Sequence, residues 1–194
     1  MKKLNLDKEK DAIDFVTDCM FSLDFLKEIS NVIFSKNRDM VTVGHFYDQW
    51  LKTSGATEYK IPFNLGIILG YVYCGILFTK EHWFDLLPDA DLASVDAKWG
   101  ISGTACSDSK ITNPGLTHVV RRIRNALGHG HVIVDVPKDL KSRTELFTRV
   151  VLTFHDKNIR DGSDTFEISL NLDQINKFIK AFQSVIHCYL RSKK

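Results

Sequence analysis

Five side chains that can bind phosphate or move protons fall within eleven residues of this chain. Three are arginines and two are histidines that lie two residues apart: Arg121, Arg122, Arg124, His129 and His131. A guanidinium group can hold a phosphate through two hydrogen bonds, and an imidazole can take or give a proton near neutral pH. The stretch RIRNALGHGHV, residues 122–132, therefore combines the residue types needed for chemistry on a phosphodiester.

These residues lie on a predicted helix that begins after Asn113-Pro114-Gly115 and ends at two glycines. Its apolar face is formed by residues at helical spacing: Leu116, Val120, Ile123 and Leu127. On this wheel Arg124 flanks the apolar face, whereas Arg121, Arg122 and Asn125 point away from it. Glycines stop helices, and cations near the C-terminal end complement the helix dipole. A basic, glycine-capped helix end is thus the simplest interpretation of the stretch.

RNALGH, residues 124–129, resembles the signature of the HEPN superfamily of helical-bundle proteins. In that superfamily an arginine on a late helix is commonly followed by a polar residue and, after four to six intervening residues, by a histidine. Arg124, Asn125 and His129 match the shortest spacing, and Arg124 with His131 matches the longest.

The resemblance implies a metal-independent endoribonuclease without a cofactor, often a toxin or defence component with a protein antitoxin as partner. RNA would be cleaved by attack of its own 2′-hydroxyl group. Arg124 would bind the phosphate, His129 would act as acid or base, and Asn125 would orient the reacting groups, with His131 as second choice for the histidine. The protein would work as a homodimer with the two motifs facing each other.

Geometry leaves two alternatives open. Positions five apart on an ideal helix lie about 140° apart, so Arg124 and His129 do not share a face. Either the helix unwinds at Gly128 and turns His129 round, or a second subunit supplies one of the two groups. A different class of function is a catalytically inactive HEPN-like module that binds RNA, a nucleotide or a protein partner.

Other residues are weaker candidates. Arg121, Lys138, Lys141 and Arg143 are candidate RNA contacts, although such basic segments are more often solvated loops. His129 and His131 could begin a metal site with the more distant Asp135 and His155. The favoured interpretation is that the two histidines simply lie at a helix–strand junction, so no metal site is expected.

The remaining pattern predicts a mainly α, HEPN-like helical bundle with a small antiparallel sheet inserted before the last helix. We expect one domain over residues 1–194, with the bundle at about 7–130 and 173–191. The β insertion is expected at about 131–170, where β-branched and aromatic residues alternate with polar ones. Residues 89–113 are expected to be a long loop with one helical turn, because they are rich in small polar residues.

Composition is that of a cytoplasmic globular protein. The formal net charge is only +2, so any contact with nucleic acid must come from a local cluster. The four cysteines form no CxxC pair, which suits a reducing compartment. The apolar segment Ile61–Phe78 has a borderline length for a membrane span. We interpret it instead as a buried helix whose glycines Gly66 and Gly70 allow close helix packing.

Overall fold

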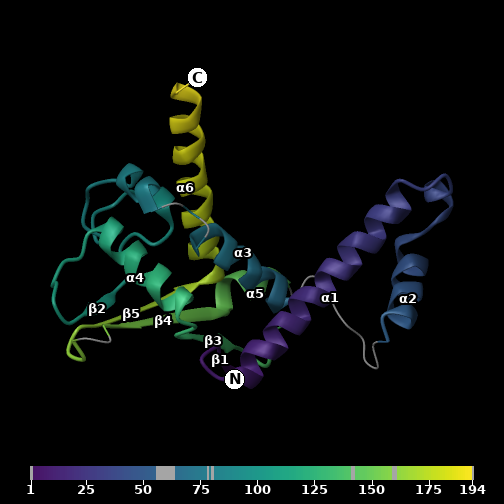
Figure 1. The fold of residues 1–194 in the computed structure, drawn as a ribbon, viewed down its shortest axis with the longest axis horizontal. Helices are drawn as coiled ribbons and strands as arrows, with labels where there is room; N and C mark the ends of the chain where they lie inside the picture. Colours follow the sequence, from purple (N-terminus) through teal and green to yellow (C-terminus); the bar gives the residue numbers. More distant parts are fainter. Residues whose placement is uncertain are drawn as a thin grey trace. The chain divides into compact units, whose positions relative to one another are not determined.

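The computed structural model describes residues 2–55, 64–77, 79, 81–140, 143–158 and 161–193. The chain forms two compact units, one of residues 13–71 and one that joins residues 1–12 to residues 72–194 (Figure 1). Most of the chain is helical, which confirms the mainly α expectation.

The unit of residues 13–71 is built by three helices and one 3-10 turn. They are most of α1 (Glu9–Ile33), the turn Arg38–Met40, α2 (Val43–Thr53) and the first part of α3 (Leu65–Leu77). Aromatic rings join α1 to α2: Phe25 lies 4.8 Å from Trp50 and 5.4 Å from Phe46 between ring centroids. The Trp50 indole N–H also donates a hydrogen bond of 3.0 Å to Asp24.

Glycine spacing explains how α3 approaches α1. A Cβ atom on Gly66 would lie 2.7 Å from the backbone nitrogen of Cys19, and one on Gly70 would lie 3.3 Å from the Cys19 sulfur. The glycines thus allow the helix contact that the sequence predicts. Among the described helices, none has the length and apolarity that a membrane crossing requires.

The second unit contains one antiparallel sheet in the order β1-β3-β4-β5-β2. The strands are β1 (Lys2–Asn5), β2 (Cys106–Asp108), β3 (Val132–Val136), β4 (Val151–Lys157) and β5 (Thr165–Asn171). Alternate residues of β4 and β5 are buried, so one face of the sheet belongs to the core and the other is more polar. On β4 and β5, Phe154 pairs with Ile168 and His155 pairs with Glu167.

Two helices pack against this sheet, α4 (Leu116–Gly128) against β4 and α6 (Leu172–Ser192) against β5. A capping box begins α6, because the side chains of Asn171 and Gln174 each accept a hydrogen bond from the other residue's backbone N–H. The buried face of α6 has the periodicity expected from the sequence: Ile175, Phe178, Ile179, Phe182 and Ile186.

Residues 89–113 are more ordered than a simple loop. They contain the 3-10 turn η3 (Ala97–Trp99) and strand β2, and they follow a second turn, η2 (Glu81–Leu86). The Trp99 ring is buried and lies 6.1 Å from the Phe178 ring of α6. This contact holds the segment against α6.

The β3, β4, β5 and α6 segments lie close to where the alternating and helical patterns predict them. Three elements were not expected: β1, β2 and the short helix α5 (Arg143–Arg149). The sheet therefore also recruits the N-terminus and the segment before α4, and is larger than a local insertion at 131–170.

The first prediction concerns the glycine contact between α1 and α3. Gly66→Ala should lower the free energy of unfolding by about 1–3 kcal/mol, because the added Cβ atom meets backbone atoms of α1. Gly44→Ala is the matched control: a Cβ atom on this glycine of α2 would have nothing within 4 Å, so alanine should be neutral or stabilising. Urea unfolding measures both. Equal effects of the two substitutions would contradict the close contact.

Candidate functional site

The end of α4 is closed by a Schellman motif. The N–H of His131 donates to the carbonyl of Ala126 at 2.9 Å, and the N–H of Gly130 donates to that of Leu127 at 3.1 Å. Gly130 has φ of +71°, the left-handed conformation that this motif requires. The chain therefore reverses at Gly130 and not at Gly128.

His129 consequently continues the direction of the helix. As the C-cap residue it has φ −99° and ψ 0°, and its N–H donates to the Asn125 carbonyl at 3.0 Å, as in a regular helical turn. The His129 side chain is exposed, and its ring lies 5.7 Å from that of His131 between centroids. Of the two alternatives left open by the sequence, unwinding at Gly128 is therefore not observed.

Arg124 lies on the flank of the apolar face, as the helical wheel predicts. Its guanidinium carbon is 5.8 Å from the centroid of the Phe84 ring, which is fully buried in η2. The Phe84 ring in turn contacts Phe182 of α6 at 5.8 Å. A cation held over an aromatic ring in this way is attracted to it, which restrains the guanidinium group.

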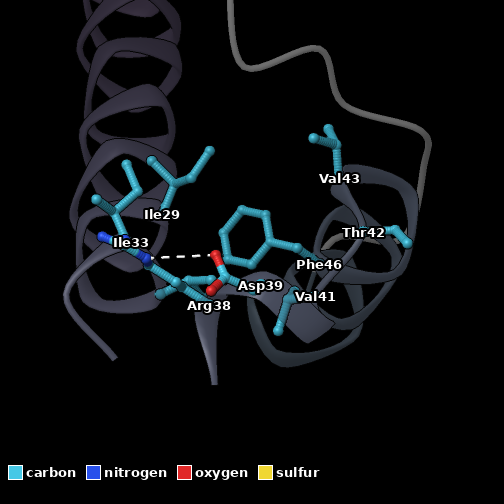
Figure 2. Close-up of a pocket in the computed structure, with 9 residues that line it drawn as sticks. Ile29, Ile33, Arg38, Asp39, Val41, Thr42, Val43 and Phe46 are labelled. Carbon is cyan, nitrogen blue, oxygen red and sulfur yellow. Dashed lines mark ion pairs between the residues drawn. The ribbon is translucent and has the colours of Figure 1, made fainter. Parts of the chain in front are cut away.

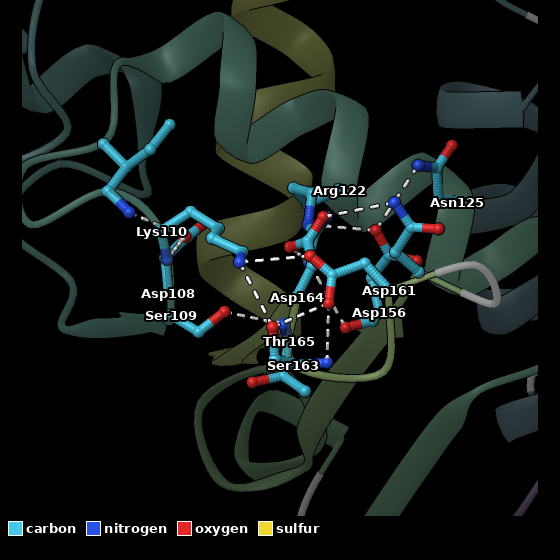
Figure 3. A network of polar contacts seen from close by, with 12 residues as sticks. Asp108, Ser109, Lys110, Arg122, Asn125, Asp156, Asp161, Ser163, Asp164 and Thr165 are labelled. Atoms are coloured by element: carbon cyan, nitrogen blue, oxygen red, sulfur yellow. Dashed lines mark hydrogen bonds and ion pairs between the residues drawn. The ribbon is translucent and has the colours of Figure 1, made fainter.

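Arg122 is placed differently from the sequence expectation. It points away from the apolar face but not into solvent: its side chain is 11% exposed and is held between two aspartates (Figure 3). Its Nε atom lies 3.0 Å from Asp156, and a terminal nitrogen lies 3.0 Å from Asp164. Asn125 was also expected to face away, and its amide donates a 3.4 Å hydrogen bond to Asp156. The β4–β5 hairpin thus contacts this side of α4, while Asn125 stays exposed.

The same network continues into the segment before α4 (Figure 3). The Lys110 ammonium group pairs with Asp161 at 3.1 Å and donates to the Ser163 hydroxyl at 3.2 Å. Hydrogen bonds from Ser163 and Lys110 lower the pKa of the Asp161 carboxyl to about 2. The hairpin is thus tied both to α4 and to the residues that follow β2.

His118 and Asp108 form a further pair that sequence reasoning missed. His118 Nε2 donates to the Asp108 carboxylate at 2.8 Å, and the Asp108 side chain is only 1% exposed. Burial alone would raise the pKa of Asp108, but hydrogen bonds from His118 and from two backbone N–H groups outweigh it and lower the pKa.

The spacing of polar residues in the sequence is the one pattern that could have predicted these contacts. His118, Arg122, Asn125 and His129 follow steps of four, three and four, so they form one polar stripe along α4. The aspartates that meet the first three lie in β2 and in the β4–β5 hairpin. Arg124 lies off this stripe, about 140° from His129.

The residues predicted as candidate RNA contacts lie in different parts of the structure. Arg121 is exposed and lies 3.7 Å from Asp85, and Lys138 is exposed in the turn after β3. Lys141 lies outside the described residues. Arg143 begins α5, and its side chain is not among those described.

The alternative metal site finds no support in the described part of the chain. There, no group of three or more histidine, cysteine, aspartate or glutamate side chains is arranged to hold a metal ion. His155 does lie across from His131, whose carbonyl accepts its N–H at 3.0 Å, but its imidazole Nδ1 pairs with Glu167 at 3.0 Å.

A hollow of about 260 Å³ lies in the other unit, between the end of α1 and the start of α2 (Figure 2). Its lining is mainly apolar, with Phe46 at its base and an ion pair between Arg38 and Asp39, 3.4 Å apart, at one side. Its lining includes no histidine. The hollow therefore lacks an imidazole, the group best suited to proton transfer near neutral pH.

The second prediction tests the role of the Arg122 network. Arg122→Ala should lower the free energy of unfolding by about 3 kcal/mol, because it leaves the buried Asp156 carboxylate without its cation. Arg121→Ala, one position earlier, removes an exposed and distant pair and should change stability by less than about 1 kcal/mol. Chemical denaturation followed by circular dichroism measures both. A similar small loss for both variants would mean that the network does not hold the hairpin.

Comparison with known proteins agrees with the HEPN resemblance that the sequence suggests. A family model described as HEPN pEK499 p136 matches residues 1–193. No curated protein and no solved structure matches the chain. Because the family match extends over nearly the whole sequence, the chain belongs to the HEPN pEK499 p136 family.

Proposed function

We propose that this protein is an endoribonuclease that cleaves RNA without a metal ion, through Arg124, His129 and Asn125. Membership of a HEPN family associates the chain with RNA- and nucleotide-related function. The observation that carries the proposal is the end of α4. There an exposed imidazole, with a second one beside it, follows an arginine restrained by an aromatic ring.

The chemistry is a transfer of the phosphodiester within the RNA strand. The ribose 2′-oxygen attacks the adjacent phosphorus and gives its proton to a base, while the bond from phosphorus to the 5′-oxygen breaks. The leaving oxygen takes a proton from an acid, so the products are a 2′,3′-cyclic phosphate and a 5′-hydroxyl group. A histidine can serve as acid or base, and an arginine opposes the charge that develops on the phosphoryl oxygens.

Asn125 has a positioning part in this proposal. Its carbonyl accepts the N–H of His129, and its side chain is tied to Asp156. The second contact fixes Asn125, and the first contact links Asn125 to the backbone of His129, which carries the exposed imidazole. His131 remains the second choice, because its ring lies next to that of His129. Among the RNA contacts, Arg121 and Lys138 are exposed.

The site is composite and formed by two copies of the chain. Because His129 continues the helix, it stays on the Asn125 side of α4, away from Arg124. A second copy can bring its histidine to the arginine of the first. α1 offers a surface for such an association, since Ile13, Val16, Met20 and Leu23 are all exposed at heptad spacing. An apolar stripe can meet its own copy across a two-fold axis.

A toxin or defence role with a protein antitoxin is the biological setting suggested by the resemblance. Such a setting fits an enzyme that attacks cellular RNA. It adds no residue to the site, and RNA cleavage by the purified protein does not depend on it.

The third prediction is that the purified protein cleaves mixed RNAs in the presence of EDTA. His129→Ala should reduce the cleavage rate by about 10²–10⁴-fold, and Arg124→Ala by about 10²–10³-fold. His45→Ala, which removes an exposed histidine of α2, is the control and should cleave at the wild-type rate. Gel analysis of end-labelled RNA measures the rates.

Each other outcome has a distinct meaning. Loss of cleavage in His131→Ala alone would make His131 the working histidine. Cleavage that persists in the Arg124, His129 and His131 variants would overturn the site. A wild-type protein that binds these RNAs and cuts none of them would instead favour the catalytically inactive binding module.

The fourth prediction tests the composite site by mixing Arg124→Ala with His129→Ala. In a mixed dimer one site loses both groups and the other keeps both, so an equal mixture should regain about a quarter of wild-type activity. The mixture is first unfolded and refolded together to exchange subunits. If both groups came from one chain, every site would lack one of them, and the mixture would stay inactive.

A further inference from the structure

The exposed face of α6 carries a stripe of hydrogen-bond donors and cations. Its residues follow steps of three, four, three and four along the helix, and all are exposed: Lys177, Lys180, Ser184, His187 and Arg191. This spacing confines them to one side of the helix. The stripe spans about 21 Å at 1.5 Å per residue. We call these five residues the α6 stripe.

Negative charge is confined to the start of this helix. Asp173 is the last carboxylate side chain of the sequence, and it pairs with Lys177 at 2.7 Å. Beyond it, every charged side chain of the helix is basic. In a protein with a net charge of only +2, the α6 stripe is a local cluster of positive charge.

One end of the stripe opens into a groove of about 440 Å³. The groove lies between η3 and α6, and its lining combines cations with apolar atoms: Lys98, Trp99, Lys177, Lys180, Ala181, Ser184 and Val185. The two walls are held together tightly. A Cβ atom on Gly100, which has φ of +73°, would lie 2.5 Å from the Gln174 carbonyl oxygen and 2.6 Å from Cβ of Lys177. Glycine at this position lets the turn meet the helix.

We propose that the α6 stripe and this groove bind the sugar–phosphate backbone of single-stranded RNA. The inference rests on the proposed function, because it supplies a binding track for the substrate of the same enzyme. Lysine and arginine side chains at regular intervals match a chain of phosphates, and the apolar atoms of the groove suit a ribose or base. The length of the stripe corresponds to several nucleotides of an extended strand.

An anionic membrane is the other surface that a basic amphipathic helix can recognise. Membrane binding by such a helix requires its apolar face to enter the lipid. Here that face is buried in the core, with Phe178, Ile179 and Phe182 each at most 3% exposed. The observations therefore favour RNA.

The fifth prediction is a binding measurement that does not require cleavage. The probe is a fluorescein-labelled 12-nucleotide RNA with 2′-O-methyl groups, which cannot react, and its anisotropy reports binding. Replacing Lys177, Lys180 and Arg191 together by alanine should weaken binding by tenfold or more near 0.1 M salt. The slope of log K against log salt should become shallower by about 2, since each lost phosphate contact in single strands contributes about 0.7.

A matched variant controls for the loss of three positive charges. Lys27, Lys36 and Lys52 are exposed residues of the other unit, and their joint replacement by alanine should leave binding and slope unchanged. Equal weakening by both triple variants would overturn the stripe as the binding surface. Thermal unfolding of each variant verifies that the fold is retained.

Two further binding measurements distinguish an RNA strand from a free nucleotide and from a membrane as the ligand. Binding of a mononucleotide that equals the binding of the 12-mer would assign the groove to a free nucleotide and overturn the strand track. Capture by phosphatidylserine vesicles, lost in the α6 variant while RNA binding persists, would assign the stripe to membranes. The result is independent of catalysis, because the 2′-O-methyl probe cannot be cleaved and the two triple variants can be compared even if the wild type cleaves nothing.

Discussion

The arrangement of the site depends on one buried guanidinium group. Arg122 lies between Asp156 of β4 and Asp164, which immediately precedes β5, and these contacts attach α4 to the β4–β5 hairpin. Removing such charges from water is unfavourable, so their position is retained only because each has its partner. Asn125 binds the same Asp156 one turn later, so two side chains fix the rotation of α4 about its axis. That rotation determines where the exposed ring of His129 points.

Most of the fold follows from local patterns in the sequence. Apolar residues at steps of three and four predict α1, α4 and α6, and alternation predicts β3, β4 and β5. In α4 and α6 these apolar residues are buried, whereas on α1 Ile13, Val16, Met20 and Leu23 are exposed. The edge strands β1 and β2 could not be predicted in this way. They have four and three residues, too few for a period to appear, and they exist because they pair with strands 100 or more and about 60 positions away. Such pairing is a property of the whole unit.

The surroundings of the candidate site could be predicted from the sequence only in part. The choice of Arg124 and His129 as candidates comes from the resemblance of RNALGH to the HEPN signature, and the helical wheel predicts the flank position of Arg124. The burial of Arg122 does not follow, because a wheel relates a residue only to the apolar face of its own helix. The partner aspartates come from the β4–β5 hairpin, 34 and 42 positions later, and they convert an apparently exposed side into a polar interface. Charged residues opposite an apolar face are therefore not necessarily in solvent.

The small net charge conceals an uneven distribution of charge. Aspartates concentrate around the polar stripe of α4, whereas the exposed face of α6 beyond its first turn is basic: the acidic group is Asp108, Asp156, Asp161 and Asp164. The side chains of Asp108 and Asp156 are at most 6% exposed, and each of the four aspartates pairs with Arg122, Lys110 or His118, so their charge is largely compensated within the fold. The exposed cations of α6, in contrast, can attract a phosphate backbone. Selective attraction of this kind arises from the placement of charges in the fold, and it requires no excess of basic residues in the composition.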